Sequence, residues 1–325
     1  MRIGVIGAGA WGTALAAVAA ENNHDVLLWA REPEVVGEIN SSGTNRRFLP
    51  DAQLSSQVRA TQDIQSLAGS GVLVQATPTQ YVRSTLDGAV AQGAVVVNVA
   101  KGIERGSHLR VSEVIAQVAP EAKAFAVLSG PSHAEEVILR MPTTVVCASA
   151  NPDVTQMVQG IFGTDAFRVY ASTDVRGVEI AGALKNVIAI AAGIVDGLGL
   201  GDNTKAALIT RGLAEIARLG VALGADHATF FGLAGLGDLY VTCASRHSRN
   251  RGVGEQIGKG ASLATILESM NSVAEGVPTT TAALELAESV QIELPITEKV
   301  AAILFDGADP RSAIRELMLR PARTE

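Results

Sequence analysis

Residues 7–12 read Gly-Ala-Gly-Ala-Trp-Gly, and they follow a short apolar strand and precede an alanine-rich helical stretch. In such a segment Gly7 permits a tight turn, Gly9 lets the backbone approach a pyrophosphate, and Gly12 lets the helix pack closely on the strand. The first N–H groups of the helix then face the anion. The pattern predicts a dinucleotide-binding turn that includes Ala10 and Trp11, while a purely structural glycine-rich turn is the alternative.

The residue expected to contact the adenosine ribose lies at the end of the second strand, residues 24–29, roughly 20 residues beyond the motif. An acidic residue there would accept a hydrogen bond from the 2′-hydroxyl of NAD, whereas this chain has Arg31 followed by Glu32. A guanidinium binds a 2′-phosphate through paired hydrogen bonds. Arg31 is therefore compatible with NADP(H) as the cofactor, and Glu32 is compatible with NAD(H). The alternative for Arg31 is a solvated surface cation.

Composition limits the classes of protein to consider. A chain of 325 residues with 47% apolar and 18% charged residues is long enough for two compact domains. The net charge of −7 argues against general nucleic-acid binding, so an anion site has to be a local basic pocket. Cys147 and Cys243 lie in no metal-ligand or disulfide spacing, so no metal is expected. No apolar run reaches the ~18 residues of a membrane span, and we expect a cytoplasmic protein without an integral membrane segment.

The pattern of expected secondary structure changes near residue 175. Before it, short β-branched runs alternate with helical stretches, and their apolar character on both faces is typical of a covered parallel sheet. These runs are residues 3–6, 24–29, 72–76, 94–99, 124–128, 143–147 and 167–170. After it, helical spacing takes over in residues 178–195, 204–223, 262–272, 279–290, 295–304 and 312–319, and Leu294-Pro295 and Asp309-Pro310 are interpreted as helix boundaries. The fold class predicted is α/β, with a doubly wound (Rossmann) dinucleotide-binding domain in residues 1–175 and a mainly helical substrate and catalytic domain in residues 176–325.

Polar residues gather directly after the buried strands, where ligands bind in open parallel sheets. Lys101 follows the strand of residues 94–99, and the segment Ser129-Gly-Pro-Ser-His-Ala134 follows the next strand. A lysine in this position would present a fixed cation to the ligand crevice, and a solvated loop lysine is the alternative.

Lys185 lies in a helical stretch where its neighbours three and four residues away are Ala181, Gly182, Ile188 and Ala189. No carboxylate on the same helix pairs with it, and a lysine on a small apolar face is costly unless it reaches a pocket or a ligand. Burial lowers the pKa of a lysine, which suits proton transfer near neutral pH. A side chain that reaches the surface from the edge of the helix is the alternative.

A third group of polar residues begins at Asp238 and continues in Ser245-Arg-His-Ser-Arg-Asn-Arg251, which we interpret as a glycine-flanked loop. Arginines with serine and asparagine provide the donors that a phosphate requires. Asp238 would orient a cation or accept a hydroxyl hydrogen bond. A solvated basic loop is the alternative, and His247 is interpreted as structural.

Taken together, seven segments closely resemble the NAD(P)-dependent sn-glycerol-3-phosphate dehydrogenases of the bacterial type. They are residues 7–16 (GAGAWGTALA), 100–103 (AKGI), 129–137 (SGPSHAEEV), 182–187 (GALKNV), 233–239 (LAGLGDL), 245–251 (SRHSRNR) and 273–277 (VAEGV). They occur in the family's order along nearly the whole chain, and the combination of the later segments is specific. Position 10 is Ala where some relatives carry Ser, which removes a side-chain hydrogen bond and leaves the turn intact.

The resemblance implies roles for matching positions. Lys185 would be the general acid and base. The substrate would be held by Lys101, Gly130, Ser132, Lys185, Asp238, Ser248, Arg249 and Asn250. The dinucleotide would be contacted by Gly7, Gly9, Ala10, Trp11, Gly12, Arg31, Lys101, Ala134, Arg249, Val273 and Glu275.

The reaction implied is reversible reduction of dihydroxyacetone phosphate to sn-glycerol 3-phosphate with NADP(H) or NAD(H), which supplies glycerophospholipid synthesis. A β-hydroxyacid dehydrogenase is the second hypothesis, although the Ser-Arg-Asn-Arg segment favours a phosphate over a carboxylate substrate. A redox sensor that only binds NADP(H) is the third, and it would need neither Lys185 nor the basic segment. A homodimer is the default assembly for such enzymes.

Overall fold

The computed structural model describes residues 1–270 and 273–321. The chain forms two compact units: a first unit of Met1–Glu104 with Leu109–Glu179, and a second unit of Arg105–His108 with Ile180–Glu325. Helix α8 (Val175–Gly197) begins where the sequence predicts the domain boundary, and its residues up to Glu179 group with the first unit. The boundary at residue 175 stays a prediction.

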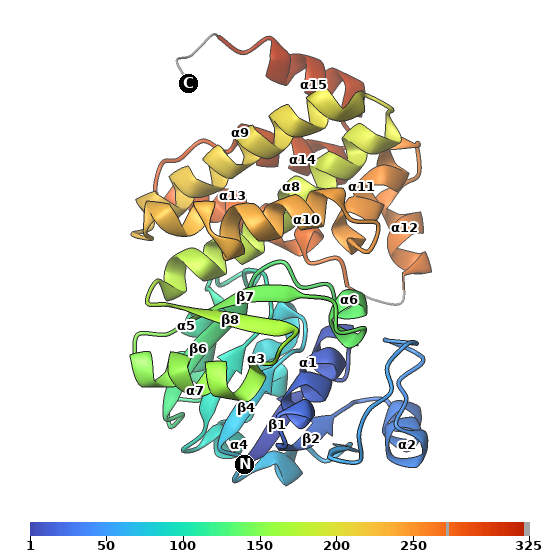
Figure 1. Ribbon diagram of the computed structural model, residues 1–325. Coiled ribbons are helices and arrows are strands. Elements are labelled where there is room, and N and C mark those ends of the chain that lie inside the picture. The colour runs from blue at the N-terminus through green and yellow to red at the C-terminus, as the bar shows by residue number, and fades with distance from the viewer. Residues whose placement is uncertain (271–272, 322–325) are drawn as a thin grey trace. The chain divides into compact units, whose positions relative to one another are not determined.

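The first unit is built on an eight-stranded sheet (Figure 1). Its strands are β1 (Arg2–Ile6), β2 (Asp25–Trp29), β3 (Val58–Thr61), β4 (Val72–Gln75), β5 (Val95–Asn98), β6 (Ala124–Ser129), β7 (Thr143–Ala148) and β8 (Phe167–Ser172). Their order is β3-β2-β1-β4-β5-β6-β7-β8, and the first six follow the order of the dinucleotide-binding fold. The predicted doubly wound class is confirmed.

Two features of the sheet depart from the sequence prediction. Strand β3 was not predicted, because it has only four residues and its Arg59 is exposed, unlike the covered apolar runs. Strand β7 runs antiparallel to β6, whereas a parallel sheet was expected. The connection between them contains only the five-residue helix α6 (Ala134–Ile138), and a parallel crossover usually needs a longer helix.

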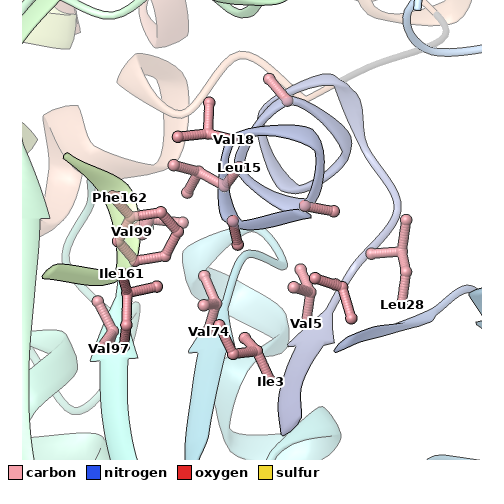
Figure 2. Close-up of a cluster of buried hydrophobic side chains, with 14 of the residues drawn as sticks. Ile3, Val5, Leu15, Val18, Leu28, Val74, Val97, Val99, Ile161 and Phe162 are labelled. Carbon is pink, nitrogen blue, oxygen red and sulfur yellow. The ribbon is translucent and has the colours of Figure 1, made fainter. Parts of the chain in front are cut away.

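Both faces of the sheet are buried, because successive side chains of each strand enter different cores. In β4, Val72 and Val74 join one cluster, and Leu73 joins the other. Figure 2 shows the first cluster, in which Leu15 and Phe162 lie over the strands. It is covered by α1 (Ala10–Glu21), α2 (Pro33–Ser42), α6 and α7 (Pro152–Phe162). The second is covered by η1 (Ile64–Leu67), α3 (Val82–Thr85), α4 (Gly88–Ala91) and α5 (Val111–Val118), and η2 (Thr79–Tyr81) leads into α3.

The second unit is helical, as the sequence predicts. Besides α8 it contains α9 (Gly201–Ala222), the 3₁₀ turn η3 (His227–Phe231), the π turn η4 (Leu233–Gly237), α10 (Asp238–Ala244), α11 (Arg249–Gly258), α12 (Leu263–Ser269), α13 (Gly276–Ser289), α14 (Pro295–Phe305) and α15 (Pro310–Met318). Helices α14 and α15 begin at the two prolines that mark helix starts in the sequence. The helix expected over residues 262–272 ends at Ser269, and residues 271–272 lie outside the described residues.

Helix α8 is the core of the second unit. It is the one described helix that is long and apolar enough to cross a membrane, and the apolar window is fully buried inside the structure. Glycines bring its backbone against α11: a Cβ atom on Gly193 would lie 1.9 Å from the carbonyl oxygen of Arg251. A Cβ atom on Gly254 would likewise lie 1.9 Å from the carbonyl oxygen of Ile190. This contact fixes the start of α11 against the helix that carries Lys185.

The start of α14 is capped by a buried carboxylate from α9. Glu215 accepts hydrogen bonds from the backbone N–H groups of Ile296 (2.9 Å) and Thr297 (3.0 Å) and from the Thr297 hydroxyl (2.7 Å). Burial raises the pKa of Glu215 above its usual range, against the opposing effect of these donors. The folded state therefore binds this proton more tightly than the unfolded chain does.

We expect Glu215 to make stability fall as pH rises. Its contribution to the free energy of unfolding is complete below a pH of about 4.5 and is lost as the pH passes through the raised pKa. Glu215→Gln removes this titration, so the stability of the variant relative to the native protein should increase over that window. Urea unfolding at a series of pH values measures the difference, with Glu298→Gln, an exposed carboxyl in the first turn of α14, as control. Parallel curves for Glu215→Gln and the native protein would contradict the expectation.

Candidate functional site

The turn after β1 has the geometry that its three glycines predict. Gly7 has a φ of 113°, and a Cβ atom there would lie 3.0 Å from the carbonyl carbon of Ala76. A Cβ atom on Gly12 would lie 2.0 Å from the carbonyl oxygen of Gly7, so α1 approaches the turn too closely for any other residue. Beside Gly9 a Cβ atom would meet nothing within 4 Å, which leaves that part of the turn open. A ligand backbone can therefore approach Gly9 directly.

The start of α1 fits an anionic group. Gly9 precedes the helix without a side-chain cap, and the first turn, which contains Ala10 and Trp11, has no acidic residue. The N–H groups of this turn and the helix dipole favour negative charge there. The centroid of the Trp11 indole ring lies 6.3 Å from the centroid of the Phe167 ring. The buried Nε1 atom of Trp11 has no hydrogen-bond partner among the described residues. The turn and its surroundings thus fit the pyrophosphate of a dinucleotide.

Arg31 and Glu32 follow β2, where the ribose-binding residue was expected. The Arg31 side chain is 76% exposed and donates to Oε1 of Glu32 at 2.9 Å. Glu32 is the residue that precedes α2, and its side chain is much less exposed. The guanidinium is therefore held beside the carboxylate at the surface, accessible to a phosphate.

Lys101 and Ser132 meet at one carbonyl beyond the ends of β5 and β6. The Nζ atom of Lys101 donates to the carbonyl oxygen of Gly130 at 3.0 Å, and the Ser132 hydroxyl donates to the same oxygen at 2.8 Å. Gly130 has a φ of 135°, a conformation that favours glycine. Ala134 is the buried first residue of α6. The structure thus groups three of the predicted substrate residues within the first unit, as a cation and a hydroxyl around one turn.

Lys185 is buried in the second unit, where its side chain meets two polar groups of α10. Its Nζ atom donates to Oδ1 of Asp238 at 2.6 Å and to Oγ1 of Thr242 at 2.7 Å. The residue is 6% exposed and Asp238 is 1% exposed. Burial disfavours the ammonium form, whereas the adjacent carboxylate favours it. The arrangement holds a proton donor at a fixed atom inside the buried part of the helical unit.

A network of amides joins the residues next to Lys185. The Asn250 side chain donates to Oδ1 of Asn186 at 2.9 Å, and its own Oδ1 accepts from the backbone N–H of Gly276 at 2.9 Å. One asparagine therefore links α8, α11 and the start of α13. The sequence did not assign a role to Asn186 or Thr242. Asn186 lies in the segment of residues 182–187, and Thr242 lies between the segments of residues 233–239 and 245–251.

The basic segment is not the loop that the sequence suggested. Helix α11 begins at Arg249, and Ser248 caps it by accepting from the backbone N–H of Arg251 at 3.2 Å. Arg249, Arg251, Gly252 and Gly254 all belong to this helix. In the sequence they stand in or beside a run of polar residues, which resembles a loop. Arg249 is exposed and makes no ion pair within the described parts of the chain.

The neighbouring Arg251 is committed to structure. It donates to Asp196 at 2.6 Å and to Glu255 at 3.1 Å, so it is less suited to bind a ligand than Arg249. Val273 and Glu275 lie just before α13, both partly buried, and the backbone carbonyl of Glu275 accepts from Thr279 at 3.1 Å. Their predicted contact with a dinucleotide stays a prediction.

Comparison with known families matches both parts of the chain. Residues 2–155 match the N-terminal family described as NAD-dependent glycerol-3-phosphate dehydrogenase, and residues 174–315 match its C-terminal counterpart. The chain belongs to the NAD-dependent glycerol-3-phosphate dehydrogenase family. The two matched ranges contain every residue that the sequence assigned to the turn, to the Lys101 segment and to the Lys185 and Arg249 region.

Relatives in this family cover the whole chain. The enzyme named glycerol-3-phosphate dehydrogenase [NAD(P)+] of Geobacillus thermodenitrificans is 52% identical over all of this chain and 96% of its own length. The enzyme of the same name from Prosthecochloris aestuarii is 51% identical over the full length of both. The crystal structure of glycerol-3-phosphate dehydrogenase from Coxiella burnetii has a TM-score of 0.92 at 37% identity, and covers 98% of this chain and 99% of its own.

Proposed function

We propose that this family member catalyses the reversible NAD(P)H-dependent reduction of dihydroxyacetone phosphate to sn-glycerol 3-phosphate. The observation that carries the proposal is the buried Lys185, whose Nζ lies 2.6 Å from Asp238 and 2.7 Å from Thr242. A ketone reductase needs a positioned proton donor for the oxygen that becomes a hydroxyl. The names of the relatives support the substrate and the cofactor.

The turn of residues 7–12 would hold the pyrophosphate, and Arg31 or Glu32 would contact the ribose end. When bound, the nicotinamide supplies the hydride that the carbonyl carbon requires. The chain contributes the open approach at Gly9 and the uncapped start of α1. Both features act on binding and orientation.

Lys185 would act on the substrate oxygen. In the direction of reduction, its protonated Nζ donates a proton to the oxygen as negative charge develops there, and the charge on the ammonium stabilises that oxygen. Asp238 and Thr242 accept the other hydrogen bonds of Nζ and so set its direction. In the direction of oxidation, neutral Lys185 accepts the hydroxyl proton.

The substrate phosphate would bind at the start of α11. Arg249 provides an exposed guanidinium there, Asn250 an amide, and the helix N-terminus favours an anion. Lys101 would contribute a second positive charge to substrate binding. Supply of sn-glycerol 3-phosphate for glycerophospholipids is the role that follows from this product, with cytoplasmic location and a homodimer as further predictions from the sequence.

The test is oxidation of NADPH and of NADH by the purified protein in the presence of dihydroxyacetone phosphate. Oxidation that depends on this substrate supports the proposal. Turnover of a β-ketoacid without turnover of dihydroxyacetone phosphate would overturn it in favour of a hydroxyacid dehydrogenase. Binding of cofactor without turnover of either substrate would also overturn it.

Arg31→Ala should weaken use of NADPH and spare use of NADH. The exposed guanidinium is the one charged donor expected at the 2′-phosphate, so we expect kcat/KM for NADPH to fall about tenfold or more. The ratio of the two kcat/KM values, measured at low and at high salt, checks this, because a charge contact weakens with salt. Arg46→Ala is the control, since Arg46 is equally exposed and pairs with Glu38. An unchanged ratio would show that Arg31 does not contact the phosphate.

A further inference from the structure

A π turn precedes the residue that contacts Lys185. In η4 the backbone N–H of Gly237 donates to the carbonyl oxygen of Gly232 at 3.1 Å, which is the five-residue spacing of a π helix. Asp238 follows at once as the first residue of α10. The π turn is rare in proteins and often lies at functional sites. The conformation of the π turn therefore determines the position of the Asp238 backbone, and with it the position of the carboxylate.

The π turn lies directly on the backbone of Phe230. A Cβ atom on Gly235 would lie 2.0 Å from the carbonyl oxygen of Phe230 and 2.5 Å from its Cα atom. No side chain fits between the two segments. The position of η4 is thus tied to the position of Phe230 by backbone contact.

The ring of Phe230 is in turn fixed on α9. Phe230 is 0% exposed, and a Cβ atom on Gly220 would lie 2.0 Å from its Cζ atom. The ring occupies the space that any side chain at position 220 would fill. The next residue, Phe231, is 56% exposed.

These contacts form one series within the second unit, from Gly220 through the Phe230 ring, the Gly235 backbone and Asp238 to Lys185. We propose that Phe230 is a positioning residue, which holds the π turn so that Asp238 fixes the Nζ atom of Lys185 for proton transfer. The inference rests on the proposed function of Lys185. It assigns a role in turnover to an aromatic residue that is outside the polar site.

Phe230→Leu tests the proposal, with Phe231→Leu as the matched control. The smaller side chain leaves a gap above Gly220 and loosens η4. Because small displacements of a reacting group are costly, we expect kcat to fall about ten- to hundredfold, with little change in the KM for cofactor. Phe231→Leu should keep native kinetics, because Phe231 is mostly exposed and its ring packs on His227, outside the series of contacts that leads to Lys185.

The pH profile separates positioning from general weakening of the fold. The groups beside Lys185 include Asp238, Thr242 and the buried thiol of Cys243, whose pKa burial raises to about 12. The charges of Asp196 and Lys205 also act on that thiol. If Asp238 is displaced, the ammonium loses its carboxylate, and the limb of the kcat profile that reports Lys185 should move to lower pH. A loss of stability alone would lower the amount of active enzyme and leave that limb in place.

A compensating pair keeps the test decisive if Phe230→Leu folds poorly. Gly220→Ala alone places a methyl group against the Phe230 ring, whereas in Gly220→Ala with Phe230→Leu the methyl group fills the gap that leucine leaves. We expect the double variant to recover kcat and the pH profile relative to either single variant. Native kcat and an unmoved pH limb in folded Phe230→Leu would overturn the proposal. So would a folded double variant whose kcat does not exceed that of either single variant. An inactive native enzyme would instead refute the proposed function.

Discussion

Lys185→Met should lower kcat by about three orders of magnitude or more. The variant removes the proton donor and the positive charge beside the developing oxyanion, effects that contribute about 10²–10⁴-fold and a further 10²-fold or more in comparable sites. Cofactor binding should persist, because the turn of residues 7–12 and Arg31 belong to the first unit. Steady-state oxidation of NADPH, with NADPH binding followed by fluorescence, measures both.

The same substitution leaves Asp238 as a buried carboxylate without its cation, so stability has to be separated from chemistry. Removing one partner of a buried ion pair costs about 3–5 kcal/mol. Lys185→Met combined with Asp238→Asn removes both charges and should recover much of the free energy of unfolding. Turnover should remain absent in the double variant. Near-native turnover in either folded variant would exclude Lys185 as the acid and base.

Local sequence patterns predicted the parts of the site that are local in the structure. The turn of residues 7–12 is specified by three glycines whose conformation and close contacts the structure shows. The sequence also singled out Lys185, because a lysine among small apolar residues on a helix is costly unless it reaches a pocket or a ligand. Helix starts at Pro295 and Pro310 followed from the fixed backbone angle of proline.

Other parts depend on contacts between distant residues, and no local pattern reports them. The partner of Lys185 lies 53 residues further along the chain, so its identity depends on how α8 and α10 pack. The direction of β7 depends on the pairing of Ser129 with Val146 across the sheet, which composition does not encode. The start of α11 at Arg249 was missed because a capping serine inside a polar run resembles a loop until the following helix is known to pack on α8.

Gly254→Ala should produce the second large effect, on stability and on substrate binding together. Its methyl group would lie 1.9 Å from the carbonyl oxygen of Ile190 and 2.9 Å from the N–H nitrogen of Ile194, both of them backbone atoms of α8 that cannot move aside as a side chain would. Helix α11 has to shift away from α8, and we expect a loss of about 3 kcal/mol or more in the free energy of unfolding. Since Asn250 bonds to Asn186 from the same helix, the shift should also raise the KM for dihydroxyacetone phosphate.

Gly252→Ala is the control because it lies two residues earlier on α11, and a Cβ atom there would meet nothing within 4 Å. It should gain about 0.5–1 kcal/mol from the lower backbone entropy of the unfolded chain. Urea unfolding and steady-state kinetics of the two variants thus compare the same substitution on the two faces of one helix. Opposite signs in stability, with a raised KM for Gly254→Ala alone, would show that backbone contact between α8 and α11 holds the substrate residues in place. Equal effects of the two substitutions would mean that helix propensity, and not this contact, determines the outcome.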